Sequence, residues 1–179
     1  MLEEGLNIEK IDRIMSRFGM PMGPFTLMDE IGMDVGYKVA LILENNFGEK
    51  MRVTEILKKF YENKWFGKKS GKGFYIHKGK NRIVNKEVYR LLSSVPKASV
   101  SDEEALQRMI YRMINEAALC LQEKVCASAS DVDIGMIMGT GFPPFRAGLL
   151  RYADSIGCGR ITDALQGFRE KYKSERFLP

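Results

Sequence analysis

Histidine and cysteine are scarce in this chain of 179 residues, which contains one histidine, three cysteines and one tryptophan. The cysteines (Cys120, Cys126 and Cys158) form no CxxC pair and leave one residue over, so they indicate free thiols in a reducing compartment. Together with His77 they provide no ligand pairs at chelating spacing, which argues against a structural zinc site. We therefore expect no bound metal.

Long apolar runs are missing as well. The longest aliphatic run covers residues 39–43, whereas a helix that spans a bilayer needs about 20 apolar residues. The first five residues lack both the basic region and the apolar core of a signal peptide. With 45% hydrophobic and 28% charged residues, the composition is that of a globular protein. These features predict a protein of the cytoplasm or of an organelle matrix, without a membrane span.

The sequence contains no complete nucleotide-binding motif. Residues 67–73 imitate a phosphate loop, but the loop is one residue short and Gly73 stands where Ser or Thr would bind magnesium. Residues 157–159 lack the third glycine of a dinucleotide fingerprint. The single histidine, His77, lies in a polar hairpin turn where we expect it to be exposed, so no acid–base or nucleophilic set is convincing. We predict no catalytic residue in the chain.

What the sequence does contain is an unevenly placed charge. Between Lys58 and Arg82 lie nine basic residues and one acid, so this basic strip carries +8 while the whole chain carries +5. Such a strip attracts nucleic acid, a membrane surface or a phosphorylated ligand, and the plain alternative is a solvated loop. Aromatic side chains interleave with its lysines, as in proteins that bind single strands: Trp65, Phe66, Phe74 and Tyr75.

Helical periodicity dominates the rest of the chain. Apolar residues recur at helical spacing in six segments: 8–18, 24–31, 34–46, 53–60, 101–121 and 161–172. The fifth segment opens on a capping box formed by Ser101 and Glu104. Residues 73–84 change to the period of strands around a glycine turn and predict a hairpin. The predicted fold is mainly α, with one small β-hairpin.

An internal repeat divides the chain. Residues 23–32 align without gaps on residues 148–157, and glycine, aspartate, isoleucine and glycine coincide. We therefore predict two related helical halves, residues 1–92 and 101–179, joined by a linker at 93–100. The first half is expected to lack its first helix, because residues 2–5 have the pattern of a final helical turn.

Aspartates occupy matching places in the two copies of this repeat. Asp29 and Asp154 coincide within the aligned segments, and Asp12 and Asp133 lie on the helix that precedes each copy. We expect Asp29 and Asp154 to accept hydrogen bonds from loop amides rather than to act as catalysts.

Several stretches resemble the C-terminal region of 3-hydroxyacyl-CoA dehydrogenases. They are FGMPMGPFTLMD at 18–29, KSGKGFY at 69–75, NEA at 115–117, GTGFPPFR at 139–146 and LRYAD at 150–154. The combination resembles the duplicated C-terminal region of the multifunctional α-subunit of fatty-acid β-oxidation, over nearly the whole chain. It implies helical halves like the C-terminal domain of 6-phosphogluconate dehydrogenase.

This resemblance implies the substrate-binding and docking portion of an NAD-dependent (3S)-3-hydroxyacyl-CoA dehydrogenase. In the family, NAD and a catalytic His–Glu pair belong to an upstream Rossmann domain, so the chain would be a fragment of an oxidoreductase that is inactive by itself. An aromatic residue that contacts acyl-CoA precedes the Gly-Phe-Pro-Pro-Phe block in bacterial members, and this chain has Met138 there. Acyl-CoA binding is thus expected at Met138, Gly139 and Phe142, whereas Asn115 is expected to be structural.

The same resemblance implies the partners. They are acyl-CoA, the upstream Rossmann domain, an enoyl-CoA hydratase (lyase) domain, and either a thiolase subunit or a second copy of the chain. The compartment would be the bacterial cytoplasm or the mitochondrial matrix. Three lysines of the basic strip, Lys68, Lys69 and Lys72, are candidates for steering the phosphates of CoA.

Two other classes of function stay open. One is a non-catalytic dimerisation or assembly module, because this domain forms the dimer in single-function members of the family. The other is a nucleic-acid-binding helical domain that uses the basic strip, although the resemblance accounts for those residues without it.

Overall fold

A computed structural model describes residues 1–92 and 100–179 of the protein, which fall into two compact units. The first unit comprises Met1–Met15 and Met22–Val100, and the second comprises Ser16–Pro21 and Ser101–Pro179. Helices dominate both units, and within the described ranges the only sheet is a two-stranded antiparallel one. The prediction of a mainly α fold with one small hairpin is confirmed.

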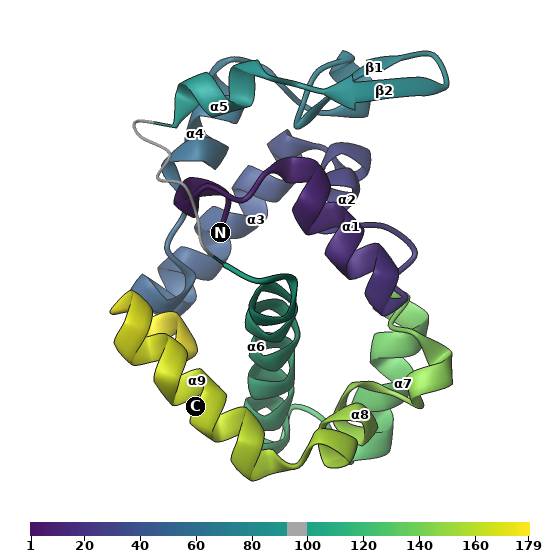
Figure 1. The fold of residues 1–179 in the computed structure, drawn as a ribbon, viewed down its shortest axis with the longest axis vertical. Helices are drawn as coiled ribbons and strands as arrows, with labels where there is room; N and C mark the ends of the chain where they lie inside the picture. Colours follow the sequence, from purple (N-terminus) through teal and green to yellow (C-terminus); the bar gives the residue numbers. More distant parts are fainter. Residues whose placement is uncertain (93–99) are drawn as a thin grey trace. The chain divides into compact units, whose positions relative to one another are not determined.

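Four of the helices described in the first unit coincide with predicted segments, and the fifth, at Glu87–Leu91, was not predicted. The helices of this unit are α1 (Ile8–Phe18, whose last three residues belong to the second unit), α2 (Pro24–Ile31), α3 (Met33–Phe47), α4 (Glu55–Glu62) and α5 (Glu87–Leu91). Strands β1 (Tyr75–Lys78) and β2 (Asn81–Val84) form the hairpin (Figure 1). In its register Tyr75 lies opposite Val84. Apolar side chains from these elements and from the residue before β1 form the buried core of the unit: Ile8, Ile11, Phe60, Phe74, Tyr75 and Val88.

The second unit contains the longest helix. Its helices are α6 (Asp102–Gln122), α7 (Ala129–Thr140), α8 (Leu149–Ile156) and α9 (Cys158–Tyr172). The Ser101 hydroxyl caps α6 by accepting a hydrogen bond from the Glu104 amide at 3.0 Å. The other half of the predicted capping box does not form, because the Glu104 side chain binds Lys171 and Tyr172 instead. Residues at helical spacing form the core: Ala105, Ile110, Leu149, Ile161 and Leu165.

The two repeat copies have matching backbone geometry. Helices α2 and α8 both have 8 residues, and the helices that follow them, α3 and α9, both have 15. Gly32 and Gly157 separate these pairs with φ of 99° and 96°, in a region that favours glycine. This agreement supports a duplication. The bounds of the halves stay a prediction, and residues 93–99 of the predicted linker lie outside the described residues.

Part of the apolar surface is not buried. The predicted stripe on α3 is present, but Val35, Val39 and Ile42 are 44%, 48% and 61% exposed. Among the residues that the structure describes, no helix has the length and apolar character needed to cross a membrane. The three cysteines are free thiols, as their spacing indicated.

Candidate functional site

Asp29 is a buried carboxylate on α2 that organises the loop leading into β1. Its Oδ1 accepts a hydrogen bond from the Phe74 amide and its Oδ2 accepts one from the Tyr75 amide, both at 2.9 Å. Glycine is required at two places beside it, since a Cβ at Gly67 or Gly73 would collide with Asp29. The expectation that Asp29 binds loop amides is confirmed.

The repeat counterpart of Asp29 behaves differently. The Asp154 side chain is 66% exposed, and its carboxylate lies 3.9 Å from the guanidinium of Arg151, one turn away. The expectation that Asp154 binds loop amides is therefore wrong. The physical reason is that the only glycine-rich hairpin in the described residues belongs to the first unit, so α8 has no such loop to hold.

His77 is held by the same buried carboxylate. Its Nε2 lies 2.8 Å from Asp29 Oδ2, and only 11% of the His77 side chain is exposed. The expectation of an exposed surface histidine is wrong, because β1 runs back over α2 and brings the imidazole to a carboxylate 48 residues earlier in the chain. No local pattern in the sequence indicates this long-range pair.

Asp12 on α1 caps the N-terminus of α2. Its carboxylate accepts hydrogen bonds from the amides of Phe25 and Thr26 at 2.8 and 3.0 Å. It also accepts one from the Tyr75 hydroxyl at 2.8 Å. Burial, followed by this hydrogen bond, raises the pKa of Tyr75 far above its ordinary value, so the phenol remains a protonated donor. Asp12 and Asp29 are thus linked through one tyrosine.

Asp133 repeats this cap in the second unit. It accepts hydrogen bonds from the amides of Leu150 and Arg151 at the start of α8, at 2.6 and 3.2 Å. These amides align with the two that Asp12 binds, so the equivalent aspartates do the same work in both copies. The repeat was the signal that could have identified them as caps.

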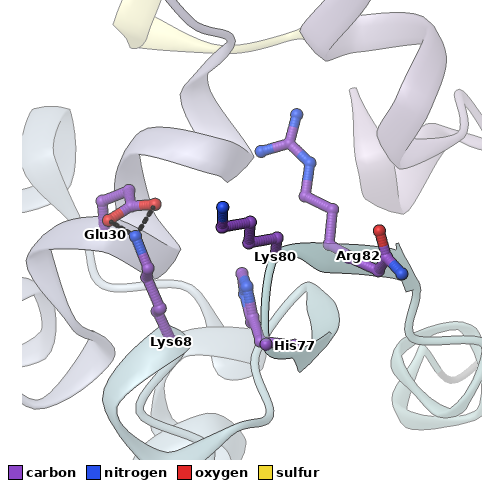
Figure 2. A pocket seen from close by; sticks show the side chains of 7 residues that line it. Glu30, Lys68, His77, Lys80 and Arg82 are labelled. Carbon is purple, nitrogen blue, oxygen red and sulfur yellow. Dashed lines mark hydrogen bonds and ion pairs between the residues drawn. The ribbon is translucent and has the colours of Figure 1, made fainter.

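A pocket of about 410 Å³ opens between the end of α2 and the hairpin. Basic side chains dominate its lining, together with one carboxylate and small polar residues: Glu30, Lys68, His77, Gly79, Lys80, Asn81 and Arg82. Lys68 Nζ bonds to both carboxylate oxygens of Glu30, at 2.8 and 2.9 Å. Figure 2 shows Lys80 extending into the space between this ion pair and the Arg82 side chain.

Two other lysines of the basic strip, Lys69 and Lys72, form ion pairs outside the pocket. Lys69 forms an ion pair with Asp34, and the hydrogen bond from Lys69 lowers the pKa of Asp34 even though desolvation opposes this. Lys72 lies 2.9 Å from Glu87 and covers the Trp65 ring. Carboxylates therefore compensate the three lysines proposed for CoA steering, which leaves Lys80 and Arg82 as stronger candidates for binding an anion.

The residues predicted to contact substrate divide into exposed and buried positions. Met138 is 81% exposed on α7, and Gly139 beside it is exposed with open space at its Cα. Phe142 is completely buried. The structure thus brings the three residues together at the end of α7 but offers only Met138 and Gly139 to a ligand.

Phe142 packs within the second unit against the segment that precedes the first proline turn. Its ring meets the Phe18 ring edge-on at 5.7 Å, and the Phe18 ring meets that of Tyr152 at 5.3 Å. Arg146 closes the cluster by donating to the Phe18 carbonyl at 3.1 Å. Asn115 donates to the carbonyl of Leu178 at 2.8 Å, which is a structural contact.

A sequence model of the 3-hydroxyacyl-CoA dehydrogenase C-terminal domain matches residues 1–77 and 105–179 of the chain. Curated relatives match along the whole chain. The fatty acid oxidation complex subunit alpha of Vibrio cholerae serotype O1 is 41% identical over 180 residues, which cover 100% of this chain and 25% of that protein. The subunit of the same name from Shewanella amazonensis is 40% identical over 182 residues, with 100% and 26% covered. The chain spans about a quarter of the length of these relatives.

Solved structures share the fold. The dehydrogenase part of multifunctional enzyme 1 from C. elegans superposes with a TM-score of 0.72 and 26% identity, covering 97% of this chain and 40% of that one. The 3-hydroxybutyryl-CoA dehydrogenase of Escherichia coli K12 gives a TM-score of 0.76 at 21% identity, covering 98% and 53%. The second likeness concerns the fold alone.

Proposed function

The chain belongs to the family of the 3-hydroxyacyl-CoA dehydrogenase C-terminal domain, and from this premise we propose that it is the substrate-side and docking portion of an NAD-dependent (3S)-3-hydroxyacyl-CoA dehydrogenase. The reaction would be the oxidation step of fatty-acid β-oxidation. The observation that carries the proposal is the family match, which extends over residues of both units.

The described residues do not fit NAD. A dinucleotide fold requires a parallel sheet with a glycine-rich turn leading into a helix, whereas the only sheet in the described residues is the antiparallel hairpin. The one imidazole, His77, is already paired with Asp29. We therefore assign the nicotinamide and the proton transfer to another part of the enzyme, and binding of the acyl-CoA to this part.

Contact with acyl-CoA is proposed at the end of α7. Met138 supplies an exposed, adaptable apolar side chain, and Gly139 lets a ligand approach the backbone. Phe142 does not touch the ligand and instead holds the end of α7 in place by packing against Phe18. This division of roles keeps the three predicted residues in one site while only two of them touch the ligand.

The larger assembly is proposed from the named relatives. They are subunits of fatty acid oxidation complexes from bacteria, and this chain corresponds to about a quarter of their length. The remaining length leaves room for the Rossmann domain and for an enoyl-CoA hydratase domain. A thiolase subunit or a second copy would complete the complex, in the bacterial cytoplasm.

Calorimetric titration of the chain with a medium-chain acyl-CoA tests the proposed contact at the end of α7. We expect weak binding that Met138→Asp weakens by about tenfold, because a charge replaces apolar contact area. Val125→Asp is the matched control, since Val125 is 69% exposed outside α7. Equal effects of the two variants, or no binding by the folded chain, would refute the assignment of Met138.

An assembly module is the second candidate, and the exposed stripe on α3 favours it. Val35, Val39 and Ile42 recur at helical spacing on one face, which is the pattern of a helix that packs against a partner. Sedimentation of the chain and of an Ile42→Glu variant tests this candidate. A dimer that the variant dissociates would support it, and a monomer at high concentration would exclude self-association.

A further inference from the structure

The pocket between α2 and the hairpin has the charge and shape of an anion site. We propose that it binds the phosphate groups of a small phosphorylated molecule through Lys80, Arg82 and Lys68. This inference goes beyond the proposed function, because it concerns a pocket in the first unit that needs no acyl chain and no residue of α7.

The cations of the pocket are not equally available. Lys68 is compensated by Glu30, whereas Lys80 and Arg82 have no carboxylate partner among the described residues of the pocket. The pocket therefore carries an excess of positive charge on its hairpin side. Two adjacent cations without counterions attract a group with two or more negative charges far more strongly than they attract a single carboxylate.

The hairpin orders one of these cations, Arg82. Arg82 lies opposite His77 in the register, and its guanidinium stacks over the Tyr75 ring at 4.8 Å. Tyr75 is itself held by Asp12, so the platform under Arg82 is rigid. A guanidinium that is already ordered loses less entropy when it forms paired hydrogen bonds to a phosphate.

A second side chain of the hairpin, His77, is also ordered. The His77 ring is anchored through Nε2 to Asp29, a carboxylate with no exposed side-chain surface. At about 410 Å³ the pocket has the size of a small-molecule site rather than of a groove for a polymer. No Phe, Tyr or Trp is among its described lining residues, and Phe74 and Tyr75 are buried in the core. These features favour phosphate groups over single-stranded nucleic acid as the ligand.

Calorimetric titration of the whole chain with inorganic pyrophosphate at low ionic strength tests the proposal. The combined substitutions Lys80→Ala and Arg82→Gln are expected to weaken binding by about tenfold or more, because two charge-assisted hydrogen bonds are lost. Lys78→Ala is the control, since Lys78 is an exposed lysine of the same hairpin that does not line the pocket. It is expected to leave the affinity unchanged.

A variant that is expected to bind more tightly distinguishes a loss of the site from misfolding, because a misfolded protein would not gain affinity. Glu30→Gln removes the one carboxylate among the described lining residues and releases Lys68, so we expect pyrophosphate to bind about threefold more tightly. Absence of binding by the folded wild type, or equal losses in Lys78→Ala and in the pocket variants, would overturn the proposal.

Two further probes identify the source of the phosphate. If adenosine 3′,5′-bisphosphate and CoA compete with pyrophosphate, the ligand is the nucleotide end of CoA; if only inorganic phosphates bind, it is a free phosphate compound. Either result supports the anion site. The experiments test the anion site and the proposed function independently. Acyl-CoA binding that depends on Met138 can persist even when the pocket variants have no effect.

Discussion

His77 Nε2 lies 2.8 Å from Oδ2 of Asp29, a carboxylate whose side chain has no exposed surface. The same carboxylate accepts hydrogen bonds from two amides at the start of β1. One buried group therefore ties the end of α2 to the hairpin that forms the basic pocket. Any change at Asp29 is expected to affect both the stability of the first unit and the shape of that pocket.

Replacement of Asp29 by alanine should destabilise the protein strongly. It leaves the buried amides of Phe74 and Tyr75 without acceptors, at a cost of about 3 kcal/mol or more in the free energy of unfolding. Urea denaturation measures this cost. Asp154→Ala is the control at the aligned position of α8, and its cost should be below about 0.5 kcal/mol because Asp154 is exposed. Similar costs for the two variants would contradict the assigned roles.

Alanine at Gly148 should destabilise the second unit, whereas alanine at Gly139 should not. A Cβ at Gly148 would collide with the Asp133 side chain that caps α8, and the φ of 116° disfavours any side chain. We expect a cost of more than about 2 kcal/mol. Gly139 lies inside α7 with nothing within 4 Å of a Cβ, so alanine should be neutral or stabilising by up to about 1 kcal/mol. Thermal unfolding of both variants checks the contrast.

The contribution of Glu104 should depend on pH. Burial raises the pKa of Glu104, but hydrogen bonds from Lys171 and Tyr172 outweigh it and hold the pKa below its ordinary value of 4.5. Because the folded-state pKa is the lower one, the stabilisation is complete above the unfolded-state pKa and is lost as the pH falls through the folded-state pKa. The difference in unfolding free energy between wild type and Glu104→Gln should therefore shrink below about pH 4.5.

A double-mutant cycle isolates this effect. In a Lys171→Met background, the loss of unfolding free energy caused by Glu104→Gln should depend less on pH. The reason is that one of the hydrogen bonds that lower the pKa of Glu104 is already absent. A pH dependence that is unchanged by Lys171→Met would mean that Lys171 does not lower the pKa of Glu104.

Apolar spacing predicted α1–α4, α6 and α9, whereas α5, α7 and α8 lie outside the segments that this spacing indicated. The hairpin was predicted from residues 73–84, and the Ser101 cap forms as expected. The roles of single polar residues were harder to predict. His77 and Asp29 are 48 residues apart, and only the folded chain brings them together.

The ion pairs of the basic strip were equally hard to predict from the sequence. Its charge was evident from composition, but which lysines are neutralised depends on carboxylates from other elements, such as Asp34 on α3 and Glu87 on α5. The repeat predicted equivalent aspartates correctly at Asp12 and Asp133 but not at Asp154. Capping needs only the next helix of the same copy, whereas the role of Asp29 needs a hairpin that α8 does not meet.

The central claim is that this chain supplies the substrate side of a dehydrogenase and no hydride-transfer chemistry. The most direct test is the rate of NADH formation from NAD and a 3-hydroxyacyl-CoA, measured for the chain alone and for the chain joined behind a nucleotide-binding domain of the same family. We expect no turnover by the chain alone and turnover by the joined protein, since the reaction needs both parts held in one geometry. NADH formation by the purified chain alone, persisting after His77→Ala, would contradict the account.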